Sequence, residues 1–106
     1  MKNERRNAPR VNVNLPARWE GVLTQQEANV TSLSKNGCFL LTGGEVQPKE
    51  LIRLEIKLPE GDCIYFWGEV VDAANEIGFA LRFTSWTDED EVRLRSFLQT
   101  EMAKPK

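Results

Sequence analysis

Residues 51–71 read LIRLEIKLPEGDCIYFWGEVV, and this stretch decides the fold class. From Leu51 to Leu58 every second residue is apolar, which predicts a strand that buries one face. Residues 59–62 are Pro-Glu-Gly-Asp, a composition typical of a tight connection, so the chain should return as a second strand over residues 63–71. The stretch therefore predicts an antiparallel hairpin, and its first strand should direct four side chains inward: Ile52, Leu54, Ile56 and Leu58.

The same period of two continues on both sides of this hairpin. It predicts four further short strands, at residues 11–19, 27–33, 38–42 and 78–83. Pro16 has no backbone N–H to donate, so we expect it at a sheet edge or a bulge. Trp19 falls on the buried face of its strand. The segment Ser34–Gly37 predicts a tight turn, with Gly37 suited to positive φ.

The C-terminal part of the chain changes to a helical pattern. Thr87 followed by Asp90, within an acidic first turn, is typical of a helix N-terminus. Apolar residues then recur at helical spacing, at Leu94, Phe97, Leu98 and Met102. We predict an α-helix over residues 88–102 and interpret it as a lid over one mouth of the barrel rather than as a partner-binding helix.

These elements predict a mainly all-β protein, a six-stranded antiparallel β-barrel with a C-terminal α-helix. A chain of 106 residues is long enough for one such domain, which we place at residues 11–104. Residues 1–10 contain almost nothing apolar, and we expect them to form a flexible arginine segment.

The charge of the chain is unevenly distributed. The formal net charge is −2, yet residues 1–10 carry a local +3 (four basic residues against one acidic) and residues 87–101 a local −3 (two basic against five acidic). Proteins that bind a long nucleic acid usually carry a clear basic excess. A small basic pole on an acidic body is better suited to a small anion than to a nucleic-acid polymer.

The composition disfavours several other functions. The chain has no histidine, so the side chain best suited to proton transfer near neutral pH is missing, and we predict that the protein is not an enzyme. We expect Cys38 and Cys63 to be small buried apolar residues in a reducing cytoplasm, and we expect no metal or cofactor. No apolar run is long enough to span a membrane, and we expect no signal peptide.

The most specific polar feature is the segment Arg6-Asn7-Ala8-Pro9-Arg10. Pro9 favours extended backbone before it, so the Cα atoms of the two arginines can lie up to about 13 Å apart. Each guanidinium group can bind a phosphate, pair with O6 and N7 of guanine, or stack on a base. A ligand with two phosphates and two purines could therefore engage both arginines; the alternative is a solvated basic tail.

A second motif, Ser32-Leu33-Ser34-Lys35-Asn36-Gly37, follows about twenty residues later. With it the chain resembles the PilZ domain family, whose signature is RxxxR followed by [D/N]xSxxG. Arg6 and Arg10 match the first motif, Ser34 and Gly37 match the second, and the order of strands and helix matches along nearly the whole chain.

The resemblance implies a bacterial, cytoplasmic receptor for the second messenger cyclic di-GMP. The binding residues that it implies are Arg5, Arg6, Arg10, Ser32, Ser34 and Gly37. It also implies that ligand binding orders the N-terminal segment, and that a downstream protein partner or a neighbouring subunit reads the new surface. A homodimer is left open.

One position departs from the family pattern, because Ser32 stands where the family has Asp or Asn. Replacing a charged hydrogen bond to guanine by a neutral one costs on the order of 1 kcal/mol. An adaptor that has lost the nucleotide is therefore one alternative. The other is a barrel that stacks single-stranded nucleic acid on Trp67 or Trp86, which the acidic pI of about 5.2 disfavours.

Overall fold

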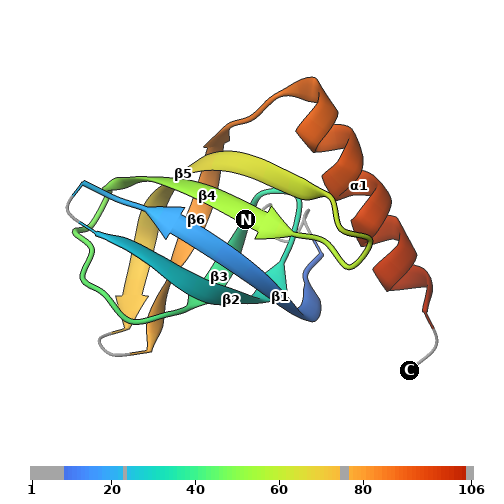
Figure 1. The fold of residues 1–106 in the computed structure, drawn as a ribbon. Coiled ribbons are helices and arrows are strands. Elements are labelled where there is room, and N and C mark those ends of the chain that lie inside the picture. Colours follow the sequence, from blue (N-terminus) through green and yellow to red (C-terminus); the bar gives the residue numbers. More distant parts are fainter. Residues whose placement is uncertain (1–8, 23, 75–76, 105–106) are drawn as a thin grey trace, which may run out of the picture.

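The computed structural model describes residues 9–22, 24–74 and 77–104. Six strands and one helix make up this part of the chain (Figure 1). Their bounds are β1 Val11–Glu20, β2 Gln25–Leu33, β3 Gly37–Leu41, β4 Leu51–Lys57, β5 Cys63–Ala74, β6 Gly78–Ser85 and α1 Asp88–Ala103.

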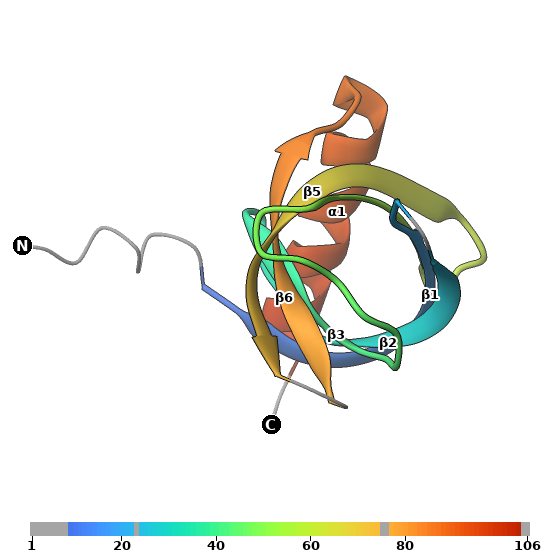
Figure 2. The same ribbon diagram turned by 90° about the vertical axis from the view of Figure 1, so that its left-hand side faces the viewer.

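The strands form a closed antiparallel barrel in the order β1-β2-β3-β6-β5-β4. Closure depends on β1, which pairs with β2 on one side and, from Ala17 to Glu20, with β4 on the other. Figure 2 shows the strands as a ring with α1 behind it, at one end of the barrel. The predicted six-stranded barrel with a C-terminal helix is confirmed.

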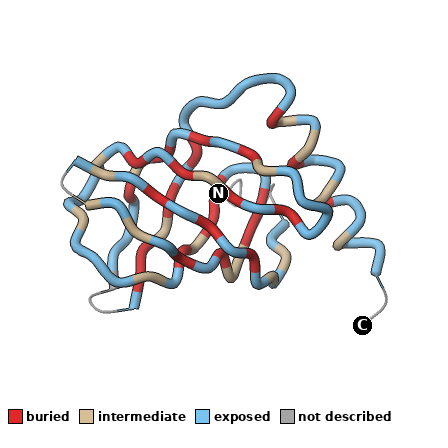
Figure 3. The backbone as a smooth tube through the Cα atoms, in the orientation of Figure 1, coloured by how far each residue is buried: buried red, intermediate tan, exposed pale blue. Residues whose placement is uncertain are grey.

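Burial follows the alternation of the sequence. Along β4 the odd positions face solvent while Ile52, Leu54 and Ile56 are fully buried, as predicted. Buried and exposed positions also alternate along β1 and the first part of β5, whereas β3 and β6 each begin with two buried residues in succession (Figure 3). The core is therefore the interior of the barrel, filled from all six strands.

Pro16 lies where the prediction placed it. The register between β1 and β2 shifts between Asn12 and Leu15, which marks an irregularity directly before the proline. Pairing of β1 with β4 begins only at Ala17. The missing N–H of Pro16 therefore leaves no gap in the ladder with β4.

Trp19 fills the barrel toward the end opposite α1. Its side chain is 1% exposed, and its indole N–H donates to the Thr42 hydroxyl at 2.9 Å. Its ring meets the Phe79 ring edge-on, with centroids 5.1 Å apart. The hydrogen bond satisfies the one polar atom of the indole, so the whole side chain contributes to the core.

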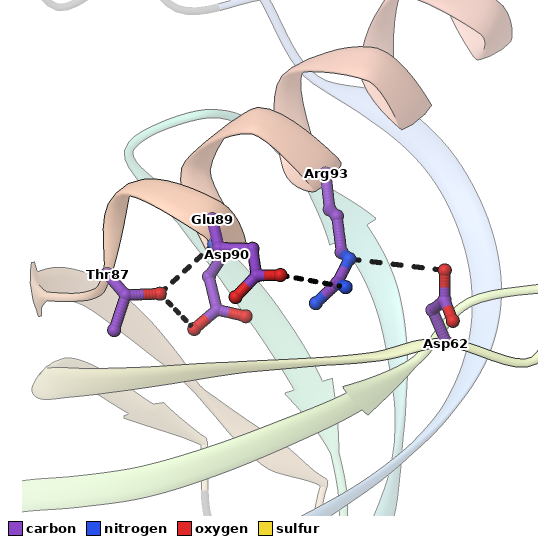
Figure 4. A network of polar contacts seen from close by, with 5 residues as sticks. All are labelled: Asp62, Thr87, Glu89, Asp90 and Arg93. Carbon is purple, nitrogen blue, oxygen red and sulfur yellow. Dashed lines mark hydrogen bonds and ion pairs between the residues drawn. The ribbon is translucent and has the colours of Figure 1, made fainter.

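Helix α1 begins at the predicted cap. The Thr87 hydroxyl accepts from the Asp90 N–H at 3.1 Å and donates to the Asp90 carboxylate at 2.9 Å (Figure 4). One turn further, Arg93 pairs with Glu89 at 3.3 Å and reaches Asp62, in the β4–β5 connection, at 4.0 Å (Figure 4). The cap and this pair join the first turns of the helix to the barrel.

The helix packs on the barrel with Leu94 and Leu98, which are buried, and with Phe97, which is half-buried. Met102 was expected on the same face, but it is 50% exposed because it lies in the last turn, beyond the barrel contact. The expectation that both cysteines are buried is wrong for Cys63. This residue begins β5 in phase with the outward-facing Tyr65, and it is half-buried.

The packing of Trp19 predicts a large effect on stability. Trp19→Ala removes a fully buried side chain and leaves a cavity, so the free energy of unfolding should fall by about 4 kcal/mol. Urea denaturation followed by circular dichroism measures the loss. Trp67→Ala, at a position 46% exposed on β5, is the control and should cost less than about 1 kcal/mol. Equal losses for the two variants would contradict the assignment of Trp19 to the core.

Candidate ligand-binding site

The two sequence motifs meet at the end of the barrel where α1 lies. Arg10 directly precedes β1, and Ser32 lies near the end of β2. Because β1 and β2 are antiparallel, with Val11 opposite Leu33, their ladder brings the two residues together. The Arg10 guanidinium Nη1 donates to the Ser32 Oγ at 3.0 Å, at an exposed position. Arg5 and Arg6, the other predicted arginines, lie outside the described residues.

Ser34 has a different place, because its side chain is buried inside the turn. Its Oγ accepts from the N–H of Asn36 at 3.1 Å and from the N–H of Gly37 at 3.3 Å. Its own N–H donates to the Gly37 carbonyl at 2.9 Å. The Ser34 hydroxyl thus closes the turn between β2 and β3, and at 2% exposure it presents almost no surface to a ligand.

Gly37 is required by the close approach of two strands. A Cβ at this position would lie 2.1 Å from the Leu81 carbonyl oxygen on β6, well inside van der Waals contact. Gly37 was expected to be suited to positive φ, but its φ is not positive. The chain needs glycine because backbone, rather than a side chain, packs against β6.

The positive charge of Arg10 affects the Cys38 thiol on β3. Burial raises the pKa of the Cys38 thiol to about 12, and the Arg10 guanidinium offsets part of that rise. Cys38 is a buried residue of β3, directly after Gly37 of the turn. The positive charge of Arg10 therefore acts on the same end of β2 and β3 that carries Ser32 and the turn.

A cleft on the other side of the turn was not predicted from the sequence. Its volume is about 410 Å³, and its walls include Lys35 and Asn36 of the turn together with Trp86 and Arg95. The backbone N–H of Phe83 on β6 donates to the Asn36 carbonyl at 2.8 Å, which ties the turn to the strand that leads to Trp86. The only signal in the sequence was Trp86 itself, an aromatic residue next to the helix cap.

Two other grooves of the surface lie away from the motifs. A shallow groove of about 620 Å³ crosses the outer faces of β1, β2 and β4, and the charges that line it have both signs. A second groove of about 290 Å³ separates α1 from the β4–β5 connection. Neither groove includes Arg10, Ser32 or the Ser34–Gly37 turn, so neither supports the predicted site.

The described residues contain no group of three or more side chains placed to hold a metal ion. Within the same part of the chain, α1 is too short and too polar to cross a membrane.

These elements define a small antiparallel β-barrel domain with a C-terminal helix, in which an exposed arginine bonds the strand before a Ser-x-x-Gly turn. The sequence model of the PilZ domain matches residues 4–100, so the chain belongs to the PilZ family. A comparison with curated proteins gave no match.

Solved structures show the same fold. The Bacillus subtilis inhibitor of motility MotI/DgrA has a TM-score of 0.79 and 18% identity over 99% of this chain, which spans only 55% of the MotI chain. The PilZ domain of YcgR from Escherichia coli, solved with c-di-GMP, has a TM-score of 0.75 and 15% identity, covering 93% of this chain and 92% of that one. The PilZ domain of CeSA from a cellulose-synthesizing bacterium has a TM-score of 0.69 and 12% identity, covering 87% and 96%.

The geometry predicts that Ser34 contributes much more to the stability of the fold than Ser32 does. Ser34→Ala leaves the buried N–H of Gly37 and the part-buried N–H of Asn36 without this acceptor, so the free energy of unfolding should fall by about 1–3 kcal/mol. Ser32→Ala removes only an exposed acceptor and should change stability by less than about 0.5 kcal/mol. Urea denaturation of the two variants measures the difference. A Ser34→Ala protein as stable as Ser32→Ala would show that the hydroxyl does not close the turn.

Proposed function

We propose that this chain is a receptor domain for cyclic di-GMP, which binds on the outer surface of the barrel beside the Ser34–Gly37 turn. The observation that carries the proposal is the Arg10–Ser32 hydrogen bond, because it places the two motifs of the family side by side. The PilZ domain of YcgR, which shares the fold, is described with c-di-GMP bound. Membership in the PilZ family adds to this support.

The chemistry of binding follows from the donors at this position. The Arg10 guanidinium has five N–H donors, and the bond to Ser32 uses one nitrogen of the fork. The remaining donors suit a phosphate or the O6 and N7 edge of guanine. Arg6, four residues earlier, supplies a second fork up to about 13 Å away, and Arg5 a third. Together they suit a ligand with two phosphates and two guanines.

Ser34 and Gly37 contribute the shape of the turn rather than contacts with the ligand. Ser34 and Gly37 are buried in the turn, and they fix where β2 ends and β3 begins. Ser32 is then held at the surface two residues before the turn, where its hydroxyl can hydrogen-bond a guanine edge.

We further propose that binding closes residues 1–10 over the ligand. The phosphates and guanines would then lie between this segment and the barrel. The surface formed by the closed segment is the output, and a protein partner or a second subunit reads it. Ordering the segment consumes part of the contact energy, which lowers the affinity for the ligand.

Removal of either arginine fork should weaken the binding of cyclic di-GMP. A hydrogen bond to a charged group contributes about 1.5–3 kcal/mol, so Arg6→Ala and Arg10→Ala should each raise the dissociation constant at least tenfold. Titration calorimetry measures the change. The matched control is Arg18→Ala, an exposed arginine on β1 beyond the site, which should bind like the wild type.

Two outcomes of this titration would overturn the proposal in different ways. Equal binding by all four proteins would remove the arginines from the site. No heat with the wild type would contradict cyclic di-GMP binding and favour the adaptor alternative, in which the barrel acts through protein contacts alone.

Ser32→Asp and Ser32→Asn should tighten the binding of cyclic di-GMP several-fold. A carboxylate at this position offers about four acceptor sites, so it can accept from Arg10 and from a guanine edge at once, with charge-assisted hydrogen bonds. Calorimetry compares these variants with the wild type. Gln25→Asp, at the exposed start of β2 and so at the other end of that strand from Ser32, makes the same change of charge away from the site and should have no effect. Unchanged or weaker binding by both Ser32 variants would show that Ser32 does not face guanine.

A further inference from the structure

The cleft beside the Ser34–Gly37 turn has the chemistry of a nucleotide subsite. It is bounded by Lys35, Asn36, Phe66, Trp86, Glu91 and Arg95. These residues come from the turn, from β5, from the segment between β6 and α1, and from α1 itself. The turn separates this cleft from the Arg10–Ser32 pair, so the two features occupy opposite sides of the same short connection.

The Arg10–Ser32 pair and the cleft are close enough for one ligand to contact both. Ser32 lies on β2, and the chain enters the cleft from the end of β6, with β3 between them. On β6 the residue level with Ser32 is Ala80, six residues before Trp86, so Trp86 forms the far wall of the cleft. The near wall is Lys35, which follows Ser32 by three residues, so the Cα atoms of Ser32 and Lys35 are at most about 11 Å apart. A molecule in which a ring of two sugar-phosphate units joins two purines can span a distance of this order. One purine can therefore lie on each side of the turn.

Trp86 gives the cleft a fixed aromatic surface. Its indole N–H donates to the Glu91 carboxylate at 3.3 Å, and its ring lies 6.1 Å from the Phe66 ring at an angle of 52°. Phe66 in turn stacks on Phe83 of β6, with centroids 4.2 Å apart. The indole is thus held from one side by the protein, while 40% of Trp86 remains exposed. Nucleobases stack on aromatic side chains held in this way.

The cleft also carries a local positive charge in an acidic protein. Lys35 is exposed, and Arg95 pairs with Glu91 at 2.9 Å while its side chain remains 62% exposed. Two cations face one carboxylate, which already bonds both Trp86 and Arg95. The free donors of the Arg95 fork suit the O6 and N7 edge of guanine, and the Lys35 ammonium suits a phosphate.

We propose that this cleft is the second guanine subsite of the cyclic di-GMP site. One guanine stacks on Trp86, Arg95 donates to its edge, and Lys35 contacts the adjoining phosphate. The other guanine lies against Arg10 and Ser32. This inference rests on the proposed function and extends it, because it assigns the second half of the ligand to residues outside both family motifs.

Calorimetric titration of Trp86→Leu and Arg95→Gln with cyclic di-GMP tests the subsite. Leucine keeps an apolar contact with Phe66 but has no flat surface, so Trp86→Leu should bind about tenfold more weakly. Arg95→Gln, at an exposed side chain that does not support the fold, should bind several-fold more weakly. The matched controls are Trp67→Leu, on the outer face of β5, and Arg93→Gln, which pairs with Glu89 on the same helix. Both controls should bind like the wild type.

A second readout comes from tryptophan fluorescence. Stacking of guanine on Trp86 should quench the emission of the wild type during the titration, and Trp86→Leu should lose that quenching while Trp67→Leu keeps it. Wild-type affinity in both cleft variants, together with weak binding by Arg10→Ala, would overturn the subsite and leave the proposed function intact. No binding by the wild type would overturn both.

Discussion

The close approach of Gly37 to the backbone of β6 is the constraint on which the site depends. No side chain fits between Gly37 and the Leu81 carbonyl, so β3 and β6 can pair at this point only through glycine. That pairing fixes the position of the turn, and the turn fixes its neighbours on both sides. Ser32 is held two residues before it, and the Asn36 carbonyl bonds Phe83 beyond it. A shift at Gly37 would therefore move both walls of the proposed site.

The residues of the two motifs differ in whether they are buried in the fold or lie at its surface, and these are two kinds of residue. Ser34 and Gly37 are buried and build the turn, whereas Arg10 and Ser32 are polar and meet at the surface. The first kind is needed for the barrel to close whether or not a ligand binds. The second kind can change without cost to the fold. Serine at position 32 is a change of the second kind, so in the proposed site it would affect the affinity for the ligand and not the formation of the barrel.

The same distinction explains what the sequence could predict. The alternation of β4 and the Thr87 cap are local patterns with one physical cause each, burial of one face and satisfaction of a free N–H, and the structure confirmed both. The outward position of Cys63 was also readable, because it is in phase with Tyr65. The reason for Gly37 was not readable, because Leu81 lies far along the chain and comes beside it only when β3 pairs with β6. The cleft at Trp86 was hidden for the same reason, since three separate segments form it.

For a ligand at the turn, the charges of nearby side chains matter more than the net charge of the chain. The acidic run at the start of α1 was interpreted only as favourable to the helix dipole, yet its last member, Glu91, also orients Trp86 and Arg95. Physiological salt screens charges beyond about 8 Å, so a ligand at the turn interacts mainly with the three cations Arg10, Lys35 and Arg95 and with the carboxylate of Glu91, rather than with the net charge of −2. A long polyanion would extend past these cations onto acidic surface. A dinucleotide with two phosphates is short enough to remain among them.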